Sequence, residues 1–184
     1  METEKFFWKV FCDDYLEIVK GRLYNPELYG EDARKAGQYT LYNSLLSIIK
    51  LVAPIMPHIT EAIYQNHFID TEKSESIHIA PWPVVDEKMI DDDIENTGDI
   101  ITEILGVVRR YKSERDLNLN ADVDEIIISC EEPLQHKLSE GFDDLKAASK
   151  AKDIAFGDGE IECENFPDIK VKVMMSEKKE EKKK

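Results

Sequence analysis

Residues 41–67, LYNSLLSIIKLVAPIMPHITEAIYQNH, decide the fold of the first half of this chain. They open with an apolar stripe at helical spacing, formed by Leu41, Leu45, Ile48, Ile49 and Val52. Pro54 ends this pattern, because proline lacks a backbone donor and its ring collides with the preceding helical turn. Pro57 is tolerated in the first turn of a new helix, where an N–H would lack a partner anyway. The stretch therefore predicts two helices that meet at a fixed bend.

A helix is also predicted before this stretch, over residues 4–20, where apolar side chains recur at helical spacing. Its stripe consists of Phe7, Val10, Phe11, Tyr15 and Ile18, with Trp8 and Val19 widening it. Gly21 stands where a helix C-cap glycine is expected, and residues 22–30 (RLYNPELYG) predict an irregular connection. A second helix is predicted over 31–52 and a third over 57–68, on the two sides of the proline bend.

Three segments of this half carry a resemblance to a known family. They are FCDDYLEIVKGRLY at 11–24, LVAPIMPHITEAIYQ at 51–65 and ESIHIAPWP at 75–83. Together they resemble the anticodon-binding domain of class I aminoacyl-tRNA synthetases for hydrophobic amino acids, over residues 6–115. The first segment is more similar to the valyl-tRNA synthetases than to their isoleucyl or leucyl relatives. The resemblance implies an earlier bundle helix before this chain, which we therefore expect to be a fragment or the product of a split gene.

The segment after the third helix is expected to cross the bundle as an extended chain. Pro81 and Pro83 favour extended backbone, and Trp82 between them is expected to be buried because of its size. A solvent-facing Trp82 that stacks on a nucleic-acid base is the alternative. The acidic stretch DEKMIDDDIEN at 86–96 predicts a domain boundary, and a long helix is predicted over 93–113.

Beyond residue 120 the hydrophobic period changes and predicts a small α+β module. The expected elements are a strand at 125–130, a helix at 133–150, and strands at 153–156, 161–163 and 169–175. An interruption of this helix at Gly141 is the alternative to a continuous one. The predicted fold class is therefore α+β. The chain is expected to comprise two parts. Residues 1–85 form a helical bundle of the anticodon-binding type that lacks the first helix of that family, and residues 86–175 form the long helix and the module. The charged run at 176–184 predicts a disordered tail.

The chain is acidic, with a formal net charge of −15. Residues 1–80 hold 8 Lys and Arg against 12 Asp and Glu, and residues 81–184 hold 16 against 27, so the second half is the more acidic. No run of about 18 apolar residues predicts a membrane span. Three scattered cysteines indicate free thiols and a cytoplasmic location, and neither they nor the four histidines have the spacing of a metal site.

Two basic segments are the candidates for RNA contact. The first set is Lys20, Arg22 and Tyr24, and the second, in RRYKSERDLNLN at 109–120, is Arg109, Arg110, Lys112 and Arg115. Aromatic rings stack on unpaired bases while cations hold phosphates. The structural alternative is that the tyrosines brace a loop and that the cations compensate helix dipoles.

The resemblance implies that the chain is the tRNA-binding region of an enzyme that joins valine to its tRNA in an ATP-dependent reaction. The catalytic signatures of that family, His-Ile-Gly-His and Lys-Met-Ser-Lys-Ser, are absent here, so no catalytic residue is assigned and the chain alone is expected to be inactive. ATP and Mg²⁺ are expected on the parent enzyme only. The expected partners are tRNA and the missing catalytic domain, with no membrane and no DNA. Two alternatives stay open: an isoleucyl- or leucyl-type synthetase region, and a stand-alone acidic helical module that binds proteins.

Overall fold

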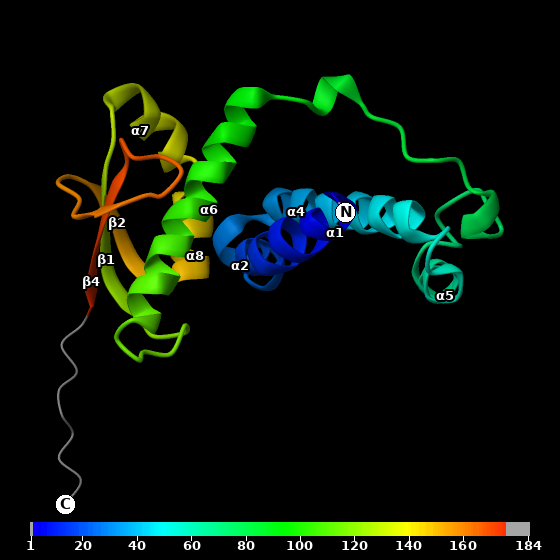
Figure 1. The fold of residues 1–184 in the computed structure, drawn as a ribbon, viewed down its shortest axis with the longest axis horizontal. Helices are drawn as coiled ribbons and strands as arrows, with labels where there is room; N and C mark the ends of the chain where they lie inside the picture. The colour runs from blue at the N-terminus through cyan, green and yellow to red at the C-terminus, as the bar shows by residue number, and fades with distance from the viewer. Residues whose placement is uncertain (1, 176–184) are drawn as a thin grey trace, which may run out of the picture. The chain divides into compact units, whose positions relative to one another are not determined.

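The computed structural model describes residues 2–175 of the chain. These residues divide into two compact units, one that ends at Ile90 and one that begins at Asp91, and their elements are drawn in Figure 1. The charged run at 176–184, for which we expect disorder, lies outside the described residues. In the part of the chain that the structure describes, no helix is long and apolar enough to cross a membrane.

The first unit begins with one continuous helical run. It consists of α1 (Glu2–Lys5), η1 (Phe6–Tyr15) and α2 (Leu16–Tyr24). η1 is a π-helix, in which each N–H bonds the carbonyl five residues back, as Leu16 does to Phe11. Side chains four residues apart lie near one another on such a helix, and the rings of Phe7, Phe11 and Tyr15 stack with successive centroid distances of 6.4 and 6.3 Å.

This π-helix makes part of the sequence prediction wrong. Trp8 and Val10, which α-helical spacing places in the buried stripe, are exposed. Gly21 is not a helix C-cap, because it is buried inside α2, which continues to Tyr24. The connection expected at 22–30 therefore contains the end of α2 and the short helix α3 (Pro26–Tyr29), and Gly30 follows with φ of 85°.

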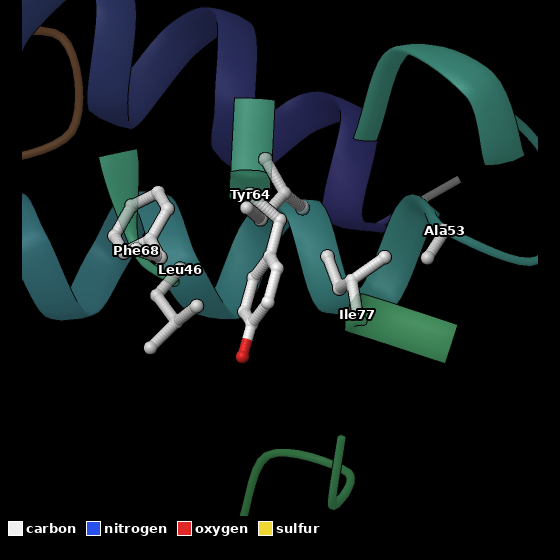
Figure 2. Packing of buried hydrophobic residues seen from close by; sticks show 6 residues of the cluster. Leu46, Ala53, Tyr64, Phe68 and Ile77 are labelled. Atoms are coloured by element: carbon white, nitrogen blue, oxygen red, sulfur yellow. The ribbon is translucent and has the colours of Figure 1, made fainter. Parts of the chain in front are cut away.

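The proline bend is confirmed. Helix α4 (Glu31–Val52) ends just before Pro54, and α5 (Pro57–His67) starts on its proline. The core of this corner, shown in Figure 2, consists of Leu46, Ile49, Ala53, Tyr64, Phe68 and Ile77. Ile77 belongs to the short helix η2 (Ile77–Ile79), so the segment after α5 folds back onto the bend. A further short helix, η3 (Glu87–Met89), lies near the end of the unit.

The second unit combines one long helix with a small mixed sheet, which confirms the α+β class. Helix α6 (Asp92–Ser113) is capped by Asp91, whose carboxylate accepts from the N–H groups of Asp93 and Ile94 at 3.1 Å. The other elements are β1 (Val123–Ser129), α7 (Glu132–Ser139), α8 (Phe142–Ser149), β2 (Ala151–Phe156), β3 (Ile161–Glu162) and β4 (Lys170–Met175). The strand order is β2-β1-β4-β3, and β1 pairs parallel to β2 and antiparallel to β4.

Gly37 marks the close approach of α4 to α2. A methyl group added there would lie 2.8 Å from Cγ2 of Val19, a branched side chain that cannot swing away easily. We expect Gly37→Ala to lower the free energy of unfolding by about 1 kcal/mol or more, because overpacking outweighs the better helix propensity of alanine. Urea unfolding followed by circular dichroism measures the change.

Gly106→Ala in α6 is the matched control for this prediction. No described atom outside its own helix lies within 4 Å of the added methyl group, so we expect a gain of about 0.5 to 1 kcal/mol from helix propensity. The prediction for Gly37 also requires that Val19→Ala relieve part of the cost when the two changes are combined. An equal stabilisation from both glycine substitutions would contradict tight packing at Gly37.

Candidate nucleic-acid interface

The first candidate set lies at the end of α2. Because this helix continues past Gly21, Lys20 and Tyr24 are four residues apart on one helical face, whereas Arg22 lies on another. Tyr24 is 75% exposed, and the exposed Lys20 pairs with Glu17 at 2.5 Å. Arg22 is half-buried. Lys20 and Tyr24 therefore share one exposed face of α2, and the ammonium group is paired with Glu17.

The second candidate set lies at the end of α6. The guanidinium of Arg115 lies over the Tyr111 ring, 3.6 Å from its centroid, and donates to the Tyr111 carbonyl at 3.4 Å. Arg110 is exposed, with a nitrogen 3.8 Å from a carboxylate oxygen of Glu164, and Arg109 is half-buried. Stacking on Tyr111 holds the planar cation of Arg115 in place while leaving its charge at the surface.

The prediction that Lys112 contacts RNA is wrong. Its side chain is 1% exposed, and its ammonium donates to the carbonyls of Leu119 at 2.9 Å and Ser149 at 2.8 Å. Burial lowers the pKa of this ammonium, although Asp122 acts in the opposite direction. Lys112 thus joins the loop after α6 to the end of α8. The sequence holds a signal for this role, because Lys112 falls four residues after Val108 on the apolar stripe of its helix.

The prediction that Trp82 is buried is also wrong, and Trp82 is an exposed aromatic residue outside both candidate sets. The side chain is 58% exposed and lines a cavity of about 290 Å³ in the first unit. The other lining residues are Lys50, Ala53, Pro54, Ile77, His78, Ala80 and Pro81. The flanking prolines were the available signal, because they keep the backbone extended and hold it out of a regular element.

The carboxylate of Glu61 on α5 fixes the segment that leads to this cavity. Its oxygens accept from the hydroxyl of Ser76 at 2.9 Å, the N–H of Ile77 at 3.1 Å and the amide of Gln65 at 2.8 Å. A ring nitrogen of His78 lies 3.9 Å away. Burial acts to raise the pKa of Glu61, but these hydrogen bonds and His78 outweigh it, and the net pKa is lowered.

Comparison with known proteins places these residues in context. A family model described as the anticodon-binding domain of tRNA ligase matches residues 1–128. This range contains the seven candidate residues, from Lys20 to Arg115, and also Glu61 and Trp82. The match therefore covers the first unit and the beginning of the second.

The similar proteins are valine–tRNA ligases. The enzyme of Methanopyrus kandleri is 37% identical over 173 residues, which are 94% of this chain and 18% of that relative. The enzyme of Methanosarcina acetivorans is 43% identical over a match that covers 67% of this chain and 13% of that relative. The enzyme of Methanococcus maripaludis is 34% identical over a match that covers 89% of this chain and 18% of that relative. The chain thus spans less than a fifth of the length of these relatives. They confirm the resemblance to valyl-tRNA synthetases, and two of them extend it into the α+β module.

Glu61→Gln tests the carboxylate that anchors the segment before Trp82. Because the pKa of Glu61 is lowered in the folded state, its contribution to stability is fully present above the ordinary value of 4.5 and is lost as the pH falls through the lowered pKa. We expect Glu61→Gln to lower the free energy of unfolding by about 1 kcal/mol at neutral pH, where charged hydrogen bonds are lost. Urea titrations at neutral pH and at about pH 3 measure this difference.

The exposed Glu75 in the same loop supplies the control. Glu75→Gln removes an equal charge, and we expect it to leave the stability nearly unchanged at both pH values. A destabilisation by Glu61→Gln that stays constant down to low pH would contradict the role of the ionised carboxylate.

Proposed function

The chain belongs to the family of anticodon-binding domains of tRNA ligases, and from this premise we propose that it binds the anticodon arm of a valine tRNA. The observation that carries the proposal is the family match over residues 1–128, within which two exposed cations each accompany a tyrosine. Lys20 shares a helical face with Tyr24, and Arg115 lies over Tyr111. Such pairs suit a single-stranded RNA loop, whose phosphates bind cations and whose bases stack on rings.

We propose that this chain contributes recognition of the tRNA to the reaction of a valine–tRNA ligase. A valine–tRNA ligase in the cytoplasm would join valine to its tRNA with ATP and Mg²⁺. We assign the binding of ATP and Mg²⁺ to the parts of such an enzyme that lie outside this chain. In the described residues no group of three or more His, Cys, Asp or Glu side chains is arranged to hold a metal ion. The residues of this chain would supply binding energy: cations position the RNA backbone, and rings and polar groups test the exposed bases.

Salt-dependent binding of tRNA tests this proposal. We expect the purified chain to bind a valine tRNA more tightly than an unrelated tRNA, with an affinity that falls as salt rises, because phosphate contacts release counterions. Titrations of both tRNAs at two salt concentrations, read by fluorescence anisotropy, measure the effect. Equal affinity for both tRNAs, or an affinity indifferent to salt, would contradict specific contact with the anticodon arm.

Single substitutions test the two cation sites separately. Lys20→Gln and Arg115→Gln should each weaken binding and should each reduce the slope of log affinity against log salt by about 0.7 to 0.9 if they remove one phosphate contact. Lys137→Gln is the matched control, since it removes an equal exposed charge from α7, outside both candidate sets. The site assignment fails if Lys137→Gln lowers the slope as much as the other two.

A further inference from the structure

The cavity beside Trp82 has the size of a site for one small planar group. Its volume of about 290 Å³ lies at the lower end of the range for ligand pockets. One wall is an indole that is more than half exposed, although tryptophan normally gains most from burial. An exposed aromatic side chain at the edge of a cavity is a feature of binding surfaces.

The segment that leads to Trp82 is anchored on α5 through residues 74–77. The buried hydroxyl of Tyr64 donates to the carbonyl of Ser74 at 2.8 Å, and the amide of Gln65 donates to the carbonyl of Glu75 at 2.6 Å. Glu61 holds the next two residues, and Ile77 is buried in the core of the corner. Trp82 follows five residues later, between two prolines that fix the backbone further. The prolines reduce the backbone conformations that Trp82 loses when its ring stacks on a ligand.

Most of the cavity lining is uncharged, which suits an uncharged ligand group. Its two basic lining residues already have acidic partners: Lys50 lies 3.6 Å from Glu72, and His78 lies 3.9 Å from Glu61. The remaining lining residues are small or apolar, among them Ala53, Pro54 and Ile77. A neutral planar heterocycle fits these walls, and the lysine and histidine can meet its polar edge.

We propose that Trp82 stacks on an unpaired nucleobase of the bound RNA loop and that this base occupies the cavity. The inference rests on the proposed function and adds a site to it, because Trp82 lies outside both basic sets. Stacking on a π-face needs no net positive charge, so the site can act in an acidic protein. The basic sets would then position the RNA backbone, while Trp82 would hold one base out of its stack.

The two tryptophans of the chain, Trp8 and Trp82, allow a direct optical test. Trp8→Phe leaves Trp82 as the sole tryptophan, and Trp82→Phe leaves Trp8. We expect an RNA hairpin with the anticodon loop of a valine tRNA to quench the fluorescence of the Trp8→Phe protein to saturation, because a stacked base quenches the indole. A fully paired hairpin should quench it much less, and the Trp82→Phe protein should respond weakly to both.

The affinity of the loop for Trp82 variants gives an independent measurement. Trp82→Leu keeps an apolar side chain but removes the π-face, and we expect it to weaken binding by about 5- to 150-fold, whereas Trp82→Phe should retain most of the affinity. Circular dichroism shows whether each variant keeps its fold.

The outcomes separate this inference from the proposed function. If the wild-type chain binds the valine tRNA in a salt-dependent manner but Trp82 is neither quenched nor needed, the stacking site is refuted and the proposed function stands. If the wild-type chain binds no tRNA, both are refuted. A Trp82 emission that shifts with protein concentration and ignores RNA would instead assign this surface to protein–protein contact and would overturn the inference.

Discussion

The hydrogen bond from the buried hydroxyl of Tyr64 to the carbonyl of Ser74 ties the segment after α5 to the core of the proline bend. A fully buried phenol needs a polar partner, and this one finds it in the segment that returns from α5. Glu61 and Gln65 lie four residues apart on one face of α5, close to Tyr64. Gln65 donates to the carbonyl of Glu75, and Glu61 accepts from Ser76 and Ile77 in the same segment. One helical face thus fixes the chain path that leads to Trp82.

The bend at Pro54 and Pro57 makes this arrangement possible, and it is also the feature that the sequence predicts best. Proline chemistry is local, so its consequences can be derived without knowledge of the tertiary structure. The α+β class follows in the same way from the change of hydrophobic period beyond residue 120. The π-helix over Phe6–Tyr15 leaves no clear signal in the sequence, because Phe7, Phe11 and Tyr15 also fit an α-helical stripe of period 3.6 approximately.

Single polar and aromatic residues were harder to assign than helices, since their environment is set by distant parts of the chain. Lys112 belongs to a basic run, yet its helical position turns it inward, where carbonyls from the following loop and from α8 satisfy it. Trp82 belongs to an apolar run, yet the prolines beside it hold it at the surface. Residue type alone thus predicts an exposed Lys112 and a buried Trp82, and both predictions are wrong. For Lys112 the position on the helix was the better guide, and for Trp82 it was the backbone restriction by its neighbours.

The net charge of −15 determines how such a protein can bind RNA at all. Repulsion between exposed carboxylates and phosphates is screened within about 8 Å at physiological salt, so acidic surfaces beyond that distance weaken binding little. A base stacked on a ring keeps its energy as salt rises, whereas each contact of a cation with a phosphate weakens. An acidic chain therefore gains little from long-range attraction and depends on a few well-positioned side chains. Arg115, stacked on Tyr111, and Trp82, exposed beside its cavity, are side chains of this kind.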